Sequence, residues 1–541
     1  MSDESAAQIP TGIDASFGHV PFYEPPEDLN LADYLLDARV REGLGDKEAL
    51  RLDDRSLTYR EVQALANRAA QAMARLGLRQ EERVVLGLHD GPEFVAALFG
   101  ALKLGAVVVM VNPQLGEVEL AGILAYSRAR LAVIDAAVLP SWEAASAGSR
   151  WLRLLVAGEL PPSSPHASFA AEVALGSDDF DNVPTHRDDP AIWLFSGGTT
   201  GRPKAVVQTH RSFAYTTECY GKRAVGYRAD DVTLSVPSLY FGYATGSNLF
   251  FPFSVGATAV LFPEPRTAEL LLAKIERHRP TILINVPTMV ARLVQHADEH
   301  PELHGHRALA SVRFATSAGE ALPVPLHDRW RETFGVELLD GLGTAEQWHI
   351  FLTNLPGRVR PGTLGTAVPG FDVRACNDDG RELPRGEVGR LWVRGGARAI
   401  GYWQNHAQTL ETFRGEWVAL GDLVRMDEDG YVTYCGRADD VLKVGGKWCT
   451  PGEIEACLLQ HPAVRECAVV GAEDELGLTK PVAFVVAGDD APAGLGEELK
   501  SFVLARLAAF KHPRRVIVMA SLPRTHLGKV DRGKLRSLAR G

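Results

Sequence analysis

Residues 196–204 read Ser196-Gly197-Gly198-Thr199-Thr200-Gly201-Arg202-Pro203-Lys204, and they directly follow the apolar run 191–195. The apolar run predicts a buried strand, and the glycines after it predict a loop. Glycine lets backbone N–H groups face an anion because it has no Cβ, while hydroxyls and a lysine add donors and a positive charge. A solvated Gly/Ser turn is the plainer alternative, but the strand and Lys204 favour a phosphate-binding loop.

The spacing of this loop differs from that of the P-loop of nucleotide hydrolases. The P-loop has four residues between its first glycine and a Gly-Lys-Ser/Thr ending. Here Lys204 follows a proline and precedes an alanine. The loop therefore predicts nucleotide chemistry of another kind.

Composition narrows the class of protein. The chain has 541 residues, enough for more than one core, with 46% apolar and 23% charged residues. Its net charge of −11 argues against a nucleic-acid-binding surface. No uncharged run reaches membrane-spanning length, and the acidic N-terminus does not resemble a signal peptide. The six cysteines form no Cys-x-x-Cys pair, so we expect neither zinc nor disulfides but reduced thiols in a cytoplasmic protein.

The order of predicted elements indicates an α/β fold. Helices over 61–76 and 92–104 alternate with buried strands over 84–88 and 106–111, a βαβ rhythm that predicts a parallel sheet. The Pro-rich residues 1–30 predict an extended arm.

Later segments change in character. Residues 159–190 predict a long surface connection. The α/β pattern resumes at 191 and continues to about 350, and 360–435 predict a β-rich subdomain. From 440 we expect a compact α+β unit with helices near 452–459 and 496–510.

Five motifs in matching order, between about 31 and 538, resemble those of the acyl-adenylate-forming enzymes: acyl-CoA ligases, peptide-synthetase adenylation domains and firefly luciferase. The resemblance implies that ATP activates a carboxylate as acyl-AMP before transfer to a thiol. It also implies a large adenylation domain over 1–437, a hinge over 438–440 and a small mobile domain over 441–541.

The remaining nucleotide candidates are glycine-containing or charged. The clusters 317–321 and 340–343, each read alone, would be plain turns, and Asp422 and Arg437 alone would be a surface ion pair. The resemblance implies instead that the clusters flank adenine and that the Asp and Arg bind ribose. The expected nucleotide-binding residues outside the loop at 196–204 are Gly319, Glu320, Asp340, Gly341, Thr344, Asp422 and Arg437.

Glu346 is the candidate magnesium ligand, because magnesium prefers carboxylates and phosphate oxygens. The resembling motif places a threonine directly before this glutamate, but this chain has Ala345 there. The change removes one hydroxyl donor, worth on the order of 1 kcal/mol or more against a charged oxygen. Thr344 is adjacent and is the residue that could compensate.

The C-terminal part of the chain supplies the candidates of the hinge and of the small domain. Lys529 alone would be a mobile surface charge, yet it matches the adenylation lysine of the resembling family and is a catalytic candidate with Glu346 and His210. The resemblance assigns Asp439 to the hinge. It assigns Lys443, Gly445 and Gly446 to the tunnel for coenzyme A.

Residues 239–257 and 346–354 closely resemble benzoate-CoA ligases. Small residues beside aromatic ones form a flat slot that suits a ring, although ordinary core packing gives the same pattern. The resemblance places Gly242, Tyr243, Gly246, Gly341 and His349 around the aryl group, with His210 orienting the carboxylate in either charge state. Ring substituents stay open.

The sequence therefore predicts an ATP-, magnesium- and coenzyme A-dependent aryl-CoA ligase for a small aromatic acid. Two alternatives remain. One transfers the aryl group to a separate carrier protein, and the other is a catalytically weak nucleotide- or aryl-binding relative, supported only by Ala345. Monomer and homodimer are equally open.

Overall fold

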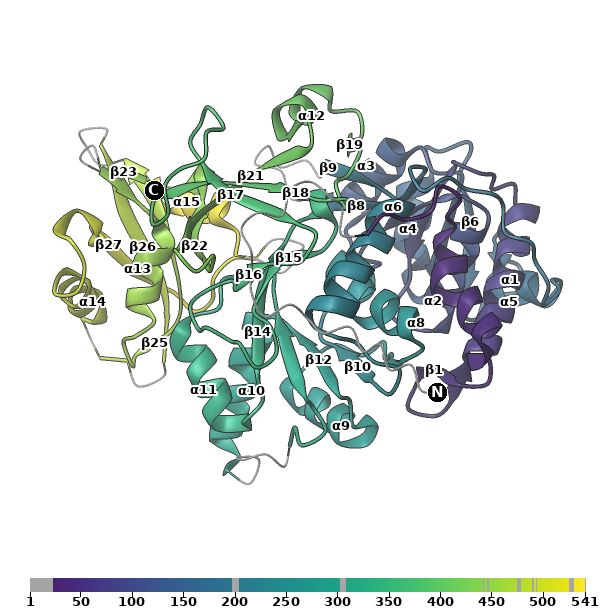
Figure 1. The fold of residues 1–541 in the computed structure, drawn as a ribbon, viewed down its shortest axis with the longest axis horizontal. Coiled ribbons are helices and arrows are strands. Elements are labelled where there is room, and N and C mark those ends of the chain that lie inside the picture. The colour runs from purple at the N-terminus through teal and green to yellow at the C-terminus, as the bar shows by residue number, and fades with distance from the viewer. Residues whose placement is uncertain are drawn as a thin grey trace, which may run out of the picture.

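The computed structural model describes residues 23–196, 204–301, 308–440, 442–444, 447–473, 478–488, 491–492, 494–524 and 530–540. Two large sheets with flanking helices, a smaller antiparallel sheet and a C-terminal α+β unit make up these residues. Figure 1 shows the C-terminal unit at one end of the molecule and α1 and α2 at the opposite end. The predicted fold class is confirmed.

The first large sheet has eight strands in the order β19-β9-β8-β4-β3-β5-β6-β7. Its central strands are short, valine-rich and buried, as expected for a parallel sheet covered on both faces. A capping box at Thr58 and Glu61 starts α1, which packs against α2. The strands are β3 (Arg83–Gly87), β4 (Val107–Met110), β5 (Leu131–Asp135), β6 (Arg153–Ala157), β7 (Ala167–Ser168), β8 (Pro190–Ser196), β9 (Lys204–Thr209) and β19 (Gly401–Tyr402), and the helices are α1 (Tyr59–Arg75), α2 (Pro92–Lys103), α3 (Glu117–Ser127), α4 (Leu139–Ser146) and α5 (Phe169–Ala174).

The second large sheet has nine strands in the order β16-β15-β14-β13-β12-β10-β11-β1-β2. Strands β14 to β1 along this order are parallel, and both edges end in antiparallel pairs. The strands are β1 (Glu48–Arg51), β2 (Ser56–Thr58), β10 (Val232–Ser235), β11 (Thr258–Val260), β12 (Ile282–Asn285), β13 (Phe314–Ser317), β14 (Leu338–Gly343), β15 (Ile350–Thr353) and β16 (Thr366–Ala367). The helices between them are α6 (His210–Thr216), α7 (Gly242–Thr245), α8 (Phe251–Val255), α9 (Ala268–His278), α10 (Pro287–Glu299) and α11 (Val324–Phe334).

The β-rich subdomain predicted over 360–435 is confirmed as an antiparallel sheet. Its members are β17 (Asp372–Cys376), β18 (Val388–Arg394), β20 (Phe413–Arg414), β21 (Trp417–Met426) and β22 (Val432–Arg437), with α12 (His406–Thr412) at its edge.

The C-terminal unit is α+β, as predicted. One face of its sheet packs against α13 and α14, and the other face packs against α15. The elements are β23 (Leu442–Val444), β24 (Lys447–Cys449), α13 (Pro451–Leu458), β25 (Val464–Glu473), β26 (Thr479–Ala487), α14 (Leu495–Leu504), β27 (Arg515–Val518) and α15 (Arg532–Arg540).

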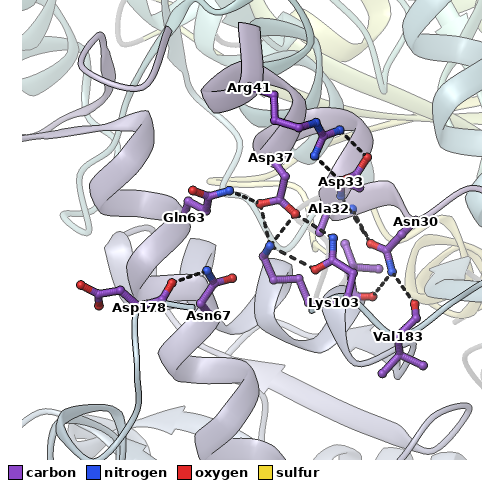
Figure 2. Close-up of polar contacts among 12 residues, drawn as sticks. Asn30, Ala32, Asp33, Asp37, Arg41, Gln63, Asn67, Lys103, Asp178 and Val183 are labelled. Atoms are coloured by element: carbon purple, nitrogen blue, oxygen red, sulfur yellow. Dashed lines mark hydrogen bonds and ion pairs between the residues drawn. The ribbon is translucent and has the colours of Figure 1, made fainter. Parts of the chain in front are cut away.

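The connection predicted over 159–190 is more ordered than its composition suggests, because it contains β7 and α5. Side chains of α1 bind its backbone. Asn67 donates to the carbonyl of Asp178 (Figure 2). Gln71 donates to the carbonyl of Ser177. These bonds satisfy polar backbone groups that a bare loop would leave to water.

A buried ion pair anchors the N-terminal segment beside the same helices (Figure 2). The ammonium of Lys103, which is 1% exposed, lies 2.6 Å from both carboxylate oxygens of Asp37 and 3.2 Å from the amide oxygen of Asn182. The amide of Asn30 binds the carbonyls of Leu102 and Val183. Residues 30–37 are therefore fixed against α2.

In the part of the chain that the structure describes, no helix is long and apolar enough to cross a bilayer. All six cysteines lie in described residues and none is bonded to another.

Candidate active site

The two segments predicted to flank adenine meet at one edge of the second sheet. Strands β13 and β14 are parallel neighbours, and Ser317 pairs with Asp340. Gly319 follows β13 with φ of +95°, a left-handed conformation that favours glycine. The carboxyl edge of a parallel sheet is the usual ligand position in α/β folds, so the topology brings these residues together where it was expected.

Asp340 and Glu320 differ in environment. Burial raises the pKa of Asp340 well above its ordinary value, and its Oδ1 has no hydrogen-bond partner among the described residues. Glu320 accepts a hydrogen bond of 2.8 Å from the Thr288 hydroxyl, and its carboxylate lies 3.9 Å from the Arg524 guanidinium of the C-terminal unit. The edge thus offers one unpaired buried acceptor and one carboxylate that contacts the small unit.

Lys204 and Glu346 gather around Tyr402, although they come from distant parts of the chain. The Tyr402 hydroxyl donates to Glu346 Oε1 at 2.7 Å. The Lys204 ammonium lies 5.6 Å from the centre of the Tyr402 ring and donates to Gln408 at 3.2 Å. Antiparallel pairing sets Lys204 opposite Ser196, so both ends of the predicted phosphate loop lie side by side. Residues 197–201 of that loop lie outside the described residues.

Thr344 directly precedes the alanine that stands in place of the missing threonine. Its Oγ1 is buried and has no hydrogen-bond partner in the described ranges. The Ala345 carbonyl accepts from the Gln208 amide at 2.5 Å, which ties the turn 345–347 to β9. A hydroxyl that is buried without a partner costs free energy unless a ligand binds it.

Asp422 and Arg437 pair across β21 and β22. Their closest side-chain atoms are 3.4 Å apart, and the Tyr434 hydroxyl lies 3.4 Å from the same carboxylate. Burial alone would lower the pKa of Arg437, but Asp422, Tyr434 and further carboxylates including that of Glu346 raise it. The ribose candidates therefore lie within electrostatic reach of the magnesium candidate.

Two of the aryl candidates, Tyr243 and Gly246, lie against the buried His349, which directly precedes β15. Its Nε2 lies 3.0 Å from the Tyr243 carbonyl and 3.2 Å from the Ser247 hydroxyl. Burial lowers the pKa of His349 to about 3, so the imidazole is neutral at pH 7. A Cβ at Gly246 would lie 2.5 Å from the His349 ring, which explains the glycine. Gly246 starts a π-helical turn, Gly246–Phe250, between α7 and α8.

The other aryl candidates have different neighbours. The Tyr243 hydroxyl hydrogen-bonds to Thr316 of β13 at 2.6 Å. Gly242 follows the extended Phe241 at the start of α7, and a Cβ there would lie 3.2 Å from the Leu194 side chain. At Gly341 a Cβ would lie 2.7 Å from the Leu352 carbonyl. Tyr243 thus connects His349 to β13, whereas Gly242 and Gly341 are packed against other residues.

His210 forms its hydrogen bond with the N-terminal segment and not with the residues around His349. Its Nδ1 accepts the Leu31 backbone N–H at 3.1 Å, and its buried Nε2 has no hydrogen-bond partner among the described residues. Burial lowers its pKa to about 4. The accepting Nδ1 requires the proton of the neutral ring to be on Nε2. His210 is therefore a neutral donor whose donor atom is unpaired.

The two aspartates of the predicted hinge, Asp439 and Asp440, differ in their contacts. Asp440 binds α15, with 2.9 Å to Arg536 and 3.6 Å to Arg532. Asp439 is exposed in the short turn Ala438–Asp440. Lys443 lies in β23. Gly445, Gly446 and Lys529 lie outside the described residues.

Among the residues that the structure describes, no three or more His, Cys, Asp or Glu side chains come together as metal ligands. Glu346 fits magnesium all the same, since this ion is usually held by one or two carboxylates together with substrate phosphates and water. The unpaired hydroxyl of Thr344, two residues before Glu346, is a hydrogen-bond donor that suits a phosphate oxygen, and the Lys204 ammonium supplies a positive charge.

The family of the chain follows from its match to known proteins. The model of the AMP-binding enzyme family matches residues 36–403. The chain belongs to the AMP-binding enzymes. The model of the AMP-binding enzyme C-terminal domain matches residues 453–529.

Relatives match over almost the full chain. The 4-hydroxybenzoate–CoA/benzoate–CoA ligase of Rhodopseudomonas palustris is 39% identical over 521 residues, which is 96% of this chain and 95% of the relative. The benzoate–CoA ligase of Thauera aromatica is 40% identical over 96% of this chain and 97% of its own length. The crystal structure of the anthranilate CoA ligase AuaEII with anthranoyl-AMP has a TM-score of 0.89 at 38% identity, covering 95% of this chain and 98% of that one.

One contributor to the site, Tyr402, lies outside every motif singled out in the sequence. It is 56 residues from Glu346, and the antiparallel pairing of β19 with β9 brings it to the site. Ser247, which lies 3.2 Å from His349, is part of the predicted aryl segment 239–257.

Proposed function

We propose that this AMP-binding enzyme is an ATP-dependent aryl-CoA ligase. It converts an aromatic carboxylate and ATP to aryl-AMP and pyrophosphate, and then converts aryl-AMP and coenzyme A to aryl-CoA and AMP. The observation that carries the proposal is the buried, neutral His349 cluster at the sheet edge that also holds Asp340 and Glu346. The full-length relatives, which are benzoate- and hydroxybenzoate-CoA ligases, support it.

Several groups would share the binding of the nucleotide. The loop at 196–204 would bind the phosphates, Asp422 and Arg437 the ribose hydroxyls, and the edge at Gly319, Glu320, Asp340 and Gly341 the adenine. Glu346 would hold magnesium, which when bound offsets phosphate charge and orients the nucleotide. Thr344 would donate its unpaired hydroxyl to a phosphate oxygen.

The acid would lie with its ring against Gly242, Tyr243, Gly246 and His349. A neutral histidine among aromatic rings suits an uncharged aryl group better than a charged one. At the carboxylate end, His210 would donate from Nε2, and Lys529 would offset the negative charge that develops as aryl-AMP forms.

Benzoate and its hydroxy- and amino-substituted forms, anthranilate among them, make up the proposed substrate class. Coenzyme A is the preferred thiol because both full-length relatives are CoA ligases. Asp439 would act as the hinge, with Lys443, Gly445 and Gly446 beside the thiol arm.

The test is a panel of aromatic acids with ATP and magnesium, followed by pyrophosphate release, with hexanoate as a control acid. Products are then weighed after adding either coenzyme A or a phosphopantetheinylated carrier protein. The proposal expects aryl-dependent pyrophosphate release and an aryl-CoA product. Loading of the carrier alone would favour the aryl-transfer alternative, and absence of pyrophosphate release with every acid would contradict the activity.

A further inference from the structure

A second buried ion pair lies outside the residues discussed so far. Asp90 follows β3 of the first sheet, and Arg266 precedes α9 of the second sheet. Their side chains are 2.7 Å apart and only 3% and 13% exposed, respectively. The pair therefore joins the two large sheets through a contact that water hardly reaches.

Asp90 also holds the segment that leads into the aryl site. Its other carboxylate oxygen accepts the backbone N–H of Leu239 at 2.8 Å. The Leu239 carbonyl in turn accepts the Thr245 hydroxyl of α7 at 2.5 Å. Gly242 and Tyr243 follow Leu239 by three and four residues, so one carboxylate fixes the start of the segment that carries the proposed ring-binding residues.

Arg266 is itself held from two sides. It donates to the Glu264 carbonyl at 2.9 Å, and its guanidinium lies 4.5 Å from the centre of the Phe262 ring. A guanidinium bound in this way has few other orientations, so Asp90 is fixed in turn.

A buried ion pair is a poor source of stability, because desolvation of both charges offsets their attraction. Each of the two oxygens of Asp90 has a distinct partner, one a charge and the other a backbone N–H. Such an arrangement suits a geometric role better than a stabilising one.

We propose that Asp90, held by Arg266, is a positioning residue that sets the aryl-binding segment 239–246 and thereby the fit of the ring. The inference rests on the proposed function. Asp90 has no contact with ATP in this proposal. Removal of its charge should therefore weaken binding of the aromatic acid and leave binding of ATP almost unchanged.

The chain supplies a matched control in Asp231. This aspartate is also 3% exposed, lies 2.7 Å from the Arg313 guanidinium, and accepts a backbone N–H, that of Arg228, at 2.8 Å. It precedes β10 at the amino edge of the second sheet, away from the carboxyl edge where the proposed site lies. Asp231 is therefore a buried aspartate with an arginine partner and a backbone N–H partner, but without the aryl segment.

The experiment compares Asp90→Asn, Asp231→Asn and the wild-type enzyme by pyrophosphate release and by thermal unfolding. We expect Asp90→Asn to raise KM for benzoate about tenfold, the effect of one lost contact of ordinary strength, with KM for ATP within about twofold. Asp231→Asn should lower the unfolding temperature and leave both KM values within about twofold. In Asp90→Asn the order of preference among 2-, 3- and 4-methylbenzoate should also change.

The inference is overturned if Asp90→Asn leaves KM for benzoate unchanged, or if both variants raise the two KM values alike. In either case wild-type turnover of aromatic acids in the same assay keeps the proposed function intact, whereas an inactive wild type contradicts the function itself. Arg266→Met is the second variant should Asp90→Asn fail to fold. Arg266→Met should raise KM for benzoate and leave KM for ATP unchanged, and Arg266→Lys should restore part of the affinity for benzoate. An equal rise of both KM values in Arg266→Met would also overturn the inference.

Discussion

Gly246→Ala tests the central contact of the aryl site. The added Cβ would lie 2.5 Å from Cδ2 and 2.7 Å from Nε2 of His349, and 3.0 Å from the Phe251 ring. Neither neighbour is free to move, because Nε2 is bonded to the Tyr243 carbonyl and the Phe251 ring packs edge-on against His349. His349 must therefore shift within its pocket.

Overpacking of this kind costs about 1–3 kcal/mol. If the cost falls on the aryl-bound state, kcat/KM for benzoate decreases about 5- to 140-fold, since 1.4 kcal/mol corresponds to a factor of ten. The measurement is the initial rate of pyrophosphate release against benzoate concentration at saturating ATP. KM for ATP should stay close to that of the wild type.

Gly122→Ala is the matched control. Gly122 is exposed on α3, and a Cβ there meets no atom within 4 Å. Alanine should favour the helix by about 1 kcal/mol and leave activity unchanged. A Gly246→Ala enzyme with wild-type kcat/KM for benzoate would refute the argument, because it would show that the His349 ring does not pack against the acid.

Three further changes test other parts of the site. Lys529→Ala should abolish aryl-AMP formation but spare conversion of supplied aryl-AMP to the thioester, and equal loss of both steps would contradict its role. Ala345→Thr should leave or raise the rate of adenylation, measured in a single turnover; a large decrease would mean that Thr344 already occupies the phosphate contact. Burial lowers the pKa of His349 to about 3. In the unfolded chain the pKa of His349 is about 6.5, so below that pH the unfolded state binds a proton that the native state does not bind. The free energy of unfolding therefore decreases as the pH falls from about 6.5 to about 3. Between pH 7 and 5 the wild type should lose about 2 kcal/mol more than His349→Gln in urea unfolding, because other groups, Asp90 included, cancel in the difference. Identical losses would show that His349 titrates normally.

Much of the fold could be predicted from local patterns. Runs such as 84–88 and 106–111 are apolar on both faces, which a parallel sheet covered by helices requires. The Ala/Leu-rich stretch 61–76 predicts a helix, and α1 (Tyr59–Arg75) confirms it, with its first turn fixed by the Thr58 capping box. The ordered β7 and α5 were missed because so short a strand and helix have too few residues to show a period.

The site could be predicted in part, and only through motif resemblance. The pairing of β13 with β14 follows from chain order and confirms the neighbourhood of Gly319 and Asp340. Tyr402 is different, because it reaches Glu346 through a two-residue strand that pairs with β9. The Leu31 N–H that fixes the tautomer of His210 is 179 residues away, and no pattern in the sequence links them.

The ion pairs of Asp440 have a consequence for observing the enzyme at work. Because Asp440 binds Arg532 and Arg536, α15 is joined to the end of the turn Ala438–Asp440, the proposed hinge. If the small unit rotates about this hinge, a fluorescent dye at the end of α15 would move with it, while a second dye on α3 of the first sheet would not. Energy transfer between the two dyes would then report the rotation in real time, without changing a residue of the proposed site.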